Sequence, residues 1–567
     1  KTGGEGEDKL YERINSHTFH SANIFGPYTD TFNEKHNLKV MAGFNVETYL
    51  YKNITASGQN LSDEYLNDLS LVTPDETGAT VTSVTGGQSE YALMGFFGRV
   101  NYDYKGRYLL EVSGRYDGTS RFAKGSRWGL FPSASAGWRI SEEDWFKPAK
   151  NVVSNLKLRL SYGSLGNQNV TAYKFIRKVQ TYDFAGFSFG EGSSTASYTS
   201  LSAPNAGDLT WETSQQYNLG LDAGFFKDRL TFTAEAYIRD TKDMLTDGVA
   251  LPSVYGASEP DMNAADLRTK GYELAVGWRD QVTLFGKPFA YNVGATLSDY
   301  RTVITKYDNK EYTFAKDYYE GMVLGEIWGF EIDGLFATDA EAQAYAQEVD
   351  LSYINKRLYG GWLAGDPRYV DINGDGIISV GANSVKNPGD RKILGNSIAS
   401  LQYGLTAGFD YMGIDFSIFF QGTGNHYWYP NDESMAFWGP YSRPYQGLLP
   451  EGFMDLVWNE NNPDAYFPRY RAYEALGTQN SLGQPNDRYL QNIGYLRFKN
   501  LTVGYTLPCW KKVFSEFRIY FSGENLWYTS PMMKYCNTID PESAAALSQA
   551  ITYGFSKSFT FGLTATF

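Results

Sequence analysis

The segment DINGDGIIS, residues 371–379, spaces oxygen-bearing groups in the way that a calcium-binding loop does. Its candidate ligands are the side chains of Asp371, Asn373 and Asp375 and the carbonyl oxygen of Ile377. Gly376 allows the sharp turn that lets oxygen ligands two residues apart converge on one hard cation. The segment therefore predicts a structural metal site, with Ca²⁺ favoured over Mg²⁺. The alternative is a plain turn of Asx and glycine residues that holds no ion.

A second stretch, residues 426–475, concentrates aromatic rings among amide, carboxylate and guanidinium groups. Flat rings beside such polar groups suit the faces and hydroxyls of sugars, and they also suit extended peptides. The candidate substrate-binding residues are Trp428, Trp438, Trp458, Tyr441 and Arg443. The alternative is that many of these rings pack the interior of a large loop or dock a partner protein.

A third group of charges surrounds the turn SGRYDGTSRF and consists of Arg115, Asp117, Arg121 and Arg127. We interpret it as a structural network in preference to a binding site. The sequence shows no nucleophile–base pair and no ligand spacing typical of zinc. We therefore predict that the chain is not an enzyme.

The elements that must position these groups show a period of two residues. Leu230, Phe232, Ala234, Ala236 and Ile238, for example, alternate with polar residues. Such runs last about 12 to 15 residues, roughly twice the usual strand of a soluble protein. No run reaches the roughly 18 apolar residues of a membrane helix. The chain is rich in Tyr (44), Phe (36) and Gly (58), and this composition with alternation is typical of a membrane β-barrel.

Short and long connections alternate along the chain. Tight links are expected at Lys105-Gly106, Lys227-Asp228 and Met412-Gly413, and a modest one between Leu507 and Ser515. The expected long loops are 52–88, 168–211, 243–264, 305–398, 426–490 and 530–554. Short turns on one rim and long loops on the other are the arrangement of outer-membrane barrels, whereas a soluble all-β array has no reason to sort loops in this way.

The strand count follows from the same pattern. We expect about fifteen antiparallel strands, the first near residues 8–25. The segment IWGFEIDGLF, residues 327–336, is either an additional strand or part of a folded loop. Cys509 and Cys536 should lie on opposite rims, separated by a whole strand and too far apart for a disulfide, so we predict two free thiols. The net charge of −14 argues against nucleic acid as a partner.

Several segments, in order along the chain, resemble the SusC/RagA branch of TonB-dependent outer-membrane transporters. They are GRVNYDYKGRYLLEVSGRYDGTSRF (98–122), GLFPSASAGWRISEEDWF (129–146), NLKLRLSYGSLGNQ (155–168), LRTKGYELAVGW (267–278), GDPRYVDINGDG (365–376), YLRFKNLTVGYTLP (495–508) and RIYFSGENLW (518–527). The resemblance implies a 22-stranded barrel with a plug in its lumen. The sequence contains neither the plug nor an energy-coupling segment. We therefore expect residues 1–567 to form the C-terminal part of one barrel domain.

The resemblance also bears on the metal loop. Position 12 of an EF-hand loop is acidic, but here it is Ala382. Members of the family often carry an Asp-Arg pair shortly after the loop. Asp390-Arg391 follows here after a longer insertion, so Asp390 is the candidate closing ligand.

The function implied by the resemblance is active import of a nutrient oligomer across the outer membrane of a Gram-negative, Bacteroidetes-like bacterium. Its implied partners are a SusD-like surface lipoprotein, the TonB complex, outer-membrane lipid and lipopolysaccharide, with dimers of transporter–lipoprotein pairs. An oligosaccharide is the favoured cargo and an oligopeptide the runner-up. A surface receptor or scaffold that does not transport is the alternative from another class.

Overall fold

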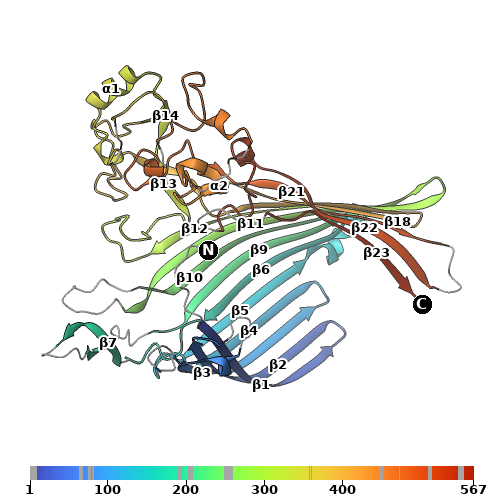
Figure 1. The fold of residues 1–567 in the computed structure, drawn as a ribbon. Coiled ribbons are helices and arrows are strands. Elements are labelled where there is room, and N and C mark those ends of the chain that lie inside the picture. The colour runs from blue at the N-terminus through green and yellow to red at the C-terminus, as the bar shows by residue number, and fades with distance from the viewer. Residues whose placement is uncertain are drawn as a thin grey trace. The chain divides into compact units, whose positions relative to one another are not determined.

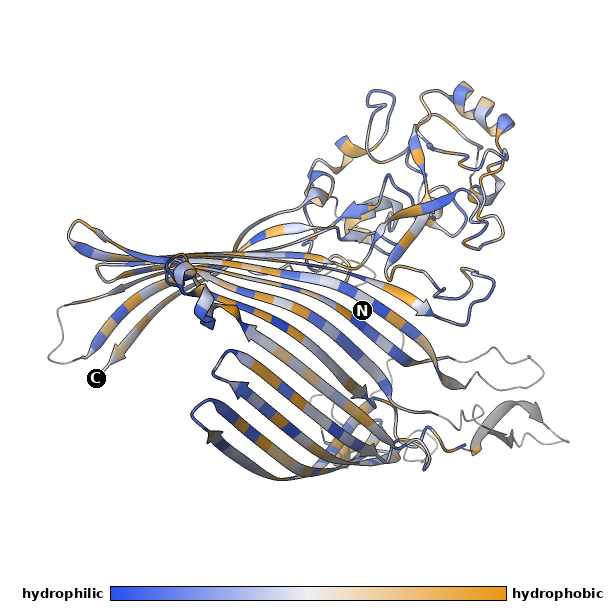
Figure 2. Cartoon of the chain, turned by 180° about the vertical axis from the view of Figure 1, so that it is seen from behind, coloured by the Kyte–Doolittle hydropathy of each residue, from blue (hydrophilic) through white to orange (hydrophobic). Residues whose placement is uncertain are grey.

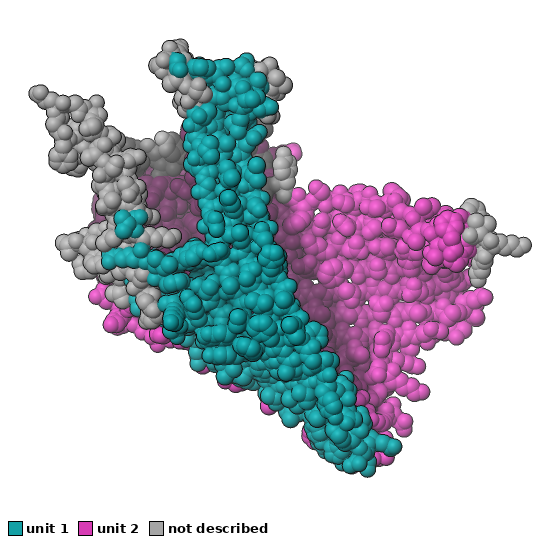
Figure 3. Space-filling view, turned by 90° about the horizontal axis from the view of Figure 1, so that it is seen from below, with its two compact units in different colours: residues 1–137, 161–216, 241–265 teal, residues 138–160, 217–240, 266–567 magenta. Residues whose placement is uncertain are grey.

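The structure is a computed structural model of the chain. It describes residues 9–62, 68–74, 78, 82–177, 179–188, 195–201, 209–247, 260–356, 358, 360–445, 449, 451–471, 473–508, 514–546 and 554–567. The chain divides into two compact units, which Figure 3 shows in two colours. Unit 1 comprises residues 1–137, 161–216 and 241–265, and unit 2 comprises residues 138–160, 217–240 and 266–567.

The dominant element within the described ranges is a sheet of fifteen strands (Figure 1), as the alternation predicts. Each strand pairs with the next in the following list. The strands are β1 Lys9–Phe32, β2 His36–Gln59, β3 Thr82–Tyr104, β4 Tyr108–Thr119, β5 Trp128–Arg139, β6 Val153–Asn167, β9 Glu212–Phe225, β10 Leu230–Asp247, β11 Asp261–Leu284, β12 Lys287–Lys306, β17 Leu401–Tyr411, β18 Ile414–Gly424, β21 Tyr495–Thr506, β22 Glu516–Thr529 and β23 Ser558–Thr566.

The connections contain short strands and helices. The strands pair as β7 (Val179–Ser188) with β8 (Thr195–Leu201), β13 (Glu326–Phe330) with β16 (Arg391–Asn396), β14 (Ile332–Leu335) with β15 (Pro367–Tyr369), and β19 (Tyr427–Trp428) with β20 (Gln491–Asn492). The α-helices are α1 (Asp339–Glu348) and α2 (Met435–Trp438). The 3₁₀-helices are η1 (Leu69–Leu71), η2 (Ile140–Glu142), η3 (Asp144–Asn151), η5 (Ser352–Ile354), η6 (Gly439–Tyr441), η7 (Phe453–Leu456), η8 (Tyr473–Leu476) and η9 (Pro531–Lys534). Among the described residues, no helix combines the length and the apolar character needed to cross a membrane.

Hydrophobic and hydrophilic residues alternate along the strands, as the banded colours of Figure 2 show. Because successive residues of a strand point to opposite sides, the sheet has an apolar and a polar face. On one face of β11 and β12, Leu274 lies opposite Leu297, and Trp278 lies opposite Val293. The other face carries polar pairs such as Glu273 with Ser298 and Arg279 with Asn292. A sheet that meets lipid on one face and water on the other has this distribution.

Tight hairpins join the strands at one end of the sheet. Lys105 and Gly106 have φ of 53° and 64°, and Met412 and Gly413 have φ of 50° and 87°. Positive φ at both central residues is the signature of a type I′ turn, whose twist matches that of the flanking strands. Phe226, Lys227 and Asp228 also have positive φ. The predicted tight links are therefore confirmed, and we call this end of the strands the short-turn end.

The opposite end, the long-connection end, carries the large loops, but the bounds expected for some of them are wrong. Strands β1, β2 and β3 have 24, 24 and 23 residues, far more than the 12 to 15 expected. Gly58 still pairs with Thr82, so β2 and β3 continue well into the predicted loop 52–88. Their outer parts are rich in Thr, Ser and Gly and lack apolar alternation. The backbones still pair there although neither face of the sheet is buried, so the side-chain pattern does not show where the strands end.

In unit 2, three long connections fold together at the long-connection end (Figure 1). We call residues 307–400, 425–494 and 530–546 the loop body. The predicted segment 327–336 belongs to it, because β13 and β14 pair within it and outside the main sheet. The members of its core that are fully buried or nearly so include Phe330, Phe336, Ile354, Tyr369, Ile378, Phe437, Trp438, Tyr441, Phe467, Leu482, Tyr489, Ile493 and Ile539. The loop body therefore has a hydrophobic core of its own.

Unit 1 has a smaller apolar cluster where its strands meet their connections. The cluster comprises Phe122, Phe131, Val170, Leu209 and Trp211. The indole N–H of Trp211 donates to the carbonyl of Arg127 at 2.9 Å. Of the two cysteines, Cys536 is a buried free thiol, and Cys509 lies outside the described residues.

Candidate functional site

The DINGDG loop is closed by hydrogen bonds from its own backbone. The two carboxylate oxygens of Asp371 accept from the amides of Gly374 and Gly376, both at 2.8 Å. Asn373 accepts from the amide of Asp375 at 3.0 Å, and Asp375 accepts from the amide of Ile377 at 2.9 Å. Gly374 and Gly376 have φ of 73° and 77°, which glycine adopts without steric cost. The three side chains that could supply oxygen ligands therefore lie in one tight loop, as the sequence predicts.

Asp390 lies against this loop although it is far along the chain. Its carboxylate accepts from the amides of Ile372 at 2.9 Å, Asn373 at 3.4 Å and Ser379 at 2.9 Å. Asp390 is fully buried, and burial raises the pKa of its carboxyl group, with the charge of Asp371 acting in the same direction. For Asp371, burial acts to raise the pKa, but the hydrogen bonds from Gly376 and Gly374 outweigh it and the pKa is lowered.

These contacts bear on whether the residues fit a cation. Among the described residues, no group of three or more His, Cys, Asp or Glu side chains is already arranged to hold a metal ion. Each carboxylate oxygen that accepts one amide keeps a second lone pair, so the loop retains acceptor capacity. The candidate ligands all offer oxygen, and three of them are carboxylates, which suits a hard cation such as Ca²⁺. The residues therefore fit the predicted ion chemically, and binding stays a prediction.

The structure separates the five predicted substrate-binding residues into two groups. Trp438 and Tyr441 are fully buried in the core of the loop body. The indole N–H of Trp438 donates to the carbonyl of Pro430 at 3.0 Å, and the Tyr441 hydroxyl donates to that of Pro468 at 2.6 Å. Their polar atoms are satisfied by backbone, so these two rings serve packing, which is the alternative that the sequence leaves open.

The other three predicted residues are partly exposed. Trp428 is in β19, and Arg443 donates to the carbonyl of Ser442 at 3.2 Å. Trp458 is covered on one face by the guanidinium of Arg469, whose central carbon lies 4.7 Å from the ring centroid. The indole nitrogen of Trp458 is buried without a hydrogen-bond partner in the described part of the chain. Contact of these three residues with substrate remains a prediction.

Two tyrosines of the same stretch are more exposed than any of these candidates. Tyr445 is 74% exposed and Tyr470 is 43% exposed. The Tyr470 ring packs edge-on against Tyr441, with centroids 5.3 Å apart, so a core residue supports it. The sequence does not distinguish these two from the buried rings, because a loop without periodicity gives no sign of which rings face solvent.

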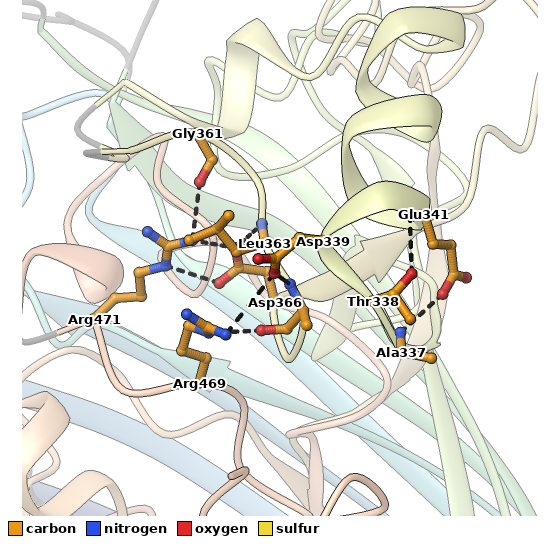
Figure 4. Close-up of polar contacts among 10 residues, drawn as sticks. Ala337, Thr338, Asp339, Glu341, Gly361, Leu363, Asp366, Arg469 and Arg471 are labelled. Atoms are coloured by element: carbon orange, nitrogen blue, oxygen red, sulfur yellow. Dashed lines mark hydrogen bonds and ion pairs between the residues drawn. The ribbon is translucent and has the colours of Figure 1, made fainter. Parts of the chain in front are cut away.

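A buried ion pair joins the two longest connections of the loop body (Figure 4). The guanidinium of Arg471 lies 2.5 Å and 2.9 Å from the two carboxylate oxygens of Asp366 and also donates to the carbonyl of Gly361 at 2.9 Å. Asp366 additionally accepts from the amide of Leu363 at 2.9 Å. Burial raises the pKa of Asp366, and Arg471 opposes that rise. The pair holds the position of the polypeptide that carries Arg469 and Tyr470.

Helix α1 is fixed beside this pair by its first turn (Figure 4). Thr338 caps the helix by accepting from the amide of Glu341 at 3.1 Å, and Glu341 accepts from the amide of Ala337 at 2.8 Å. This reciprocal arrangement is a close variant of the capping box. Asp339 accepts from the amide of Ala364 at 2.8 Å and lies 4.0 Å from Arg469. The helix therefore anchors the segment that leads to Asp366.

The charged group around SGRYDGTSRF lies in unit 1 and makes contacts typical of a structural network. Arg115 binds both carboxylate oxygens of Asp117 at 2.9 and 3.0 Å. Arg121 donates to the carbonyl of Val170 at 3.0 Å and lies over the ring of Tyr91 at 4.0 Å. Arg127 donates to the carbonyl of Phe122 at 3.1 Å. These guanidinium groups hold backbone and neighbouring side chains in place.

Comparison with known protein families gives a match over most of the chain. The model described as TonB dependent receptor-like, beta-barrel matches residues 5–526. The chain belongs to this family. Its fifteen-stranded antiparallel sheet agrees with that assignment, and no plug-like domain is identified among the described residues.

Curated relatives point to the predicted branch. TonB-dependent receptor SusC of Bacteroides thetaiotaomicron is 30% identical over 501 residues, which are 85% of this chain and 44% of the relative. TonB-dependent receptor P39 of Formosa agariphila is 27% identical over 531 residues, 87% of this chain and 47% of the relative. The chain spans about half the length of the curated relatives it matches. Membership of the SusC/RagA branch is thereby confirmed, and the relatives are named as receptors, which fits the prediction of a non-enzyme.

Solved structures confirm the fold. The RagAB peptide importer in the "open-open" state superposes with a TM-score of 0.77 at 22% identity, covering 99% of this chain and 56% of that chain. Another structure of the RagAB peptide transporter gives a TM-score of 0.75 at the same identity. At this identity the likeness establishes the architecture of the sheet and loops.

Proposed function

We propose that this chain forms the wall and an extracellular loop body of a TonB-dependent importer that carries a nutrient oligomer across the outer membrane. The proposal assigns the long-connection end to the cell exterior, because outer-membrane barrels place short turns in the periplasm. The polar face of the sheet would line the passage. The TonB complex would supply the energy, and a SusD-like lipoprotein would cooperate at the surface. This chain would contribute passage and substrate contact, and no chemical step.

The observation that carries the proposal is the independent core of the loop body. Large loops that only connect strands have no need of a core that includes Phe330, Trp438 and Ile539, three residues from three different connections. A rigid body at the mouth of a barrel can present a fixed surface to a solute. The family match over residues 5–526 gives the barrel beneath it.

The cargo that we favour is an oligosaccharide. Exposed tyrosines that pack on core rings, as Tyr470 packs on Tyr441, offer flat apolar faces with a polar edge. Arg443 and the partly exposed Trp428 add hydrogen-bonding groups nearby in sequence. An oligopeptide is the second candidate, because extended peptides use the same kinds of contact and the structurally similar RagAB is named a peptide importer.

Growth of a strain that lacks the gene tests both cargoes. We expect the strain to lose growth on one or more oligosaccharides as sole carbon source, and to keep growth on peptides and on the corresponding monosaccharides. Loss of growth on peptides alone would show that the cargo is a peptide and not a glycan. Unchanged growth on every oligomer would contradict import itself.

Variants at the exposed rings test the contact surface. The double variant Tyr445→Ala/Tyr470→Ala should weaken binding of the oligomer identified by growth by about tenfold, since losing a ring contact costs about 0.5 to 1.5 kcal/mol. A matched control is Tyr318→Ala, which removes a ring of the loop body that is 40% exposed and lies outside the stretch 426–475. Equal affinity of the double variant and the control would remove Tyr445 and Tyr470 from the site.

We further propose that the DINGDG loop binds Ca²⁺ through Asp371, Asn373, Asp375, the carbonyl of Ile377 and Asp390. The ion would offset most of the negative charge that the carboxylates of Asp371, Asp375 and Asp390 bring to this small loop. Bound to the folded state alone, it would stabilise the loop body by mass action. Its role would be structural.

A further inference from the structure

Two unpaired cations lie opposite each other on the apolar face of the sheet in unit 2. Lys270 in β11 pairs with Arg301 in β12. The next pairs on the same face are Tyr272 with Asp299 and then Leu274 with Leu297. Because alternate residues share a face, both cations project on the side that carries the apolar residues. Both are exposed.

The level of this cation pair relative to the membrane follows from the aromatic residues of the same face. Phe289 begins the apolar face near the short-turn end, and Asp299, opposite Tyr272, lies ten residues further along β12. Ten residues of strand span about 33 Å. With a tilt of about 40° this corresponds to about 25 Å along the membrane normal, the height of the apolar band of an outer-membrane barrel. Lys270 and Arg301 therefore lie just beyond the band, at the headgroups of the outer leaflet.

Neighbouring charges on this face show how unusual the cation pair is. Arg268 lies two residues further out and binds both oxygens of Asp240, at 2.6 and 2.9 Å. In the part of the chain that the structure describes, neither Lys270 nor Arg301 has an ion pair or a side-chain hydrogen bond. Like charges directly opposite each other destabilise a sheet. An anion between the two cations would remove that cost.

A hollow of about 590 Å³ adjoins the cation pair. Lys270 and Arg301 line it together with Ser400 and Asn425, whose hydroxyl and amide groups can bind the oxygens of a polar headgroup. Asp299 also lines it. Its carboxylate lies one pair below the cations and would repel an anion placed at its own level. The favourable position for an anion is therefore at the level of Lys270 and Arg301.

A second hollow, of about 380 Å³, lies on the same face below the first, within the apolar band. Two rows of paired residues form it across four strands, Val276–Ala295–Leu405–Phe420 and Trp278–Val293–Ala407–Ile418. In each row a single alanine lies between large side chains, and this leaves the space. Six residues separate Lys270 from Val276, about 20 Å along the strand and about 15 Å along the membrane normal. That depth is the length of an acyl chain in one leaflet, half of a hydrocarbon core of about 30 Å.

We propose that these two hollows form a binding site for the lipid anchor of lipopolysaccharide, with a phosphate between Lys270 and Arg301 and an acyl chain against Ala295 and Ala407. Two cations at headgroup level match a phosphorylated headgroup, and the apolar hollow at acyl depth matches its chain. The outer leaflet is the leaflet that this end of the strands faces. The proposal rests on the outer-membrane placement of the protein and does not depend on what the protein imports.

Titration of the purified full chain in a neutral detergent tests the proposal, with bound lipid counted by native mass spectrometry. The probes are hexa-acylated diphosphoryl lipid A, the same lipid after removal of its phosphates, and phosphatidylglycerol. We expect lipid A to bind most tightly. Lys270→Gln/Arg301→Gln should weaken its binding by about 30-fold, from the contribution of each basic residue at an anionic surface. Ala295→Leu/Ala407→Leu, which fills the apolar hollow, should also weaken it.

Controls and a second variant keep the outcome decisive. Lys227→Gln/Lys287→Gln removes two positive charges at the short-turn end and should leave lipid A binding unchanged. Asp299→Asn should tighten binding by about fivefold, because it removes a repelling carboxylate. Folding of each variant is judged by heat-modifiable migration on gels. If the double glutamine variant does not fold, the Asp299→Asn variant tests the proposal in its place. Equal binding of lipid A by wild type and the double glutamine variant would overturn the proposal, as would binding of dephosphorylated lipid A or phosphatidylglycerol as tight as that of lipid A.

Discussion

Replacing Arg471 by methionine should open the loop body locally. Arg471 is the partner of Asp366, whose side chain is 1% exposed, while that of Arg471 is 13% exposed. Methionine keeps most of the apolar stem of the side chain, so the change removes mainly the charge and its hydrogen bonds. Asp366 would then retain the amide of Leu363 as its donor and the weaker influence of the Arg469 charge, but lose its hydrogen-bonded counter-charge.

The size of the effect follows from the burial of the pair. Removing one partner of a buried ion pair costs about 3 to 5 kcal/mol, because the remaining charge is left uncompensated. A change of about 1.4 kcal/mol is tenfold in an equilibrium constant. The protection of amides around Asp366 and Arg471 should therefore fall by about two to three and a half powers of ten. The deficit should be larger at pH 8 than at pH 5, because burial already raises the pKa of Asp366 and a neutral carboxyl needs no counter-charge.

Hydrogen exchange of the full chain in detergent, followed by mass spectrometry of peptides, measures this opening. The peptides of interest cover residues 361–370 and 465–471. A matched control is Arg368→Met, since Arg368 binds Asp333 and Glu341 but is 34% exposed, and an exposed pair contributes about 0 to 1 kcal/mol. A loss of protection below tenfold for Arg471→Met, or an equal loss for both variants, would refute the reasoning from burial.

Three further predictions concern the same body. Trp438→Ala should lower the free energy of unfolding by about 3 to 5 kcal/mol, because it leaves a cavity in the core. The loss is measured from the thermal midpoint of the near-ultraviolet circular dichroism. A loss of less than about 1 kcal/mol in the free energy of unfolding would contradict the placement of Trp438 in the core. Arg497→Met leaves the buried carboxylate of Asp540 without its partner at 2.5 Å, so trypsin should cleave after Lys534 much faster than in wild type; an unchanged rate would argue against this attachment. Chelation of calcium should lower the thermal midpoint of wild type, and Asp375→Asn should need about tenfold more Ca²⁺ to recover it; insensitivity of wild type to chelation would remove the ion from the loop.

The sheet was largely predictable from the sequence, and its strand ends were not. Along β11 and β12, apolar residues such as Leu274 and Val293 alternate with polar ones, and lipid on one side enforces that alternation. Beyond the lipid, the outer part of β3 continues as TSVTGGQSE, where no face is buried. The hydrogen bonds of the backbone hold such a segment in the sheet whatever its side chains are, so hydropathy does not mark its end.

The loop body was predictable only in part. The spacing of Asp371, Asn373 and Asp375 indicates a tight loop, and the structure places Asp390 against it. The spacing of Thr338 and Glu341 in the sequence is that of a capping box and marks the start of α1. Which rings are core and which are surface depends on contacts between connections far apart in the chain, and no local pattern encodes such contacts. For that reason Trp438 appeared to be a candidate for substrate contact.

The core of the loop body also constrains the order in which the molecule can assemble. Phe330 and Ile539 belong to one cluster although about 200 positions separate them, and the strands β17, β18, β21 and β22 lie between them in the chain. Closing so long a loop costs entropy that only the finished contacts repay. The body can therefore mature only after these strands have found their register. A well-packed loop body is therefore a sign that these strands have paired correctly.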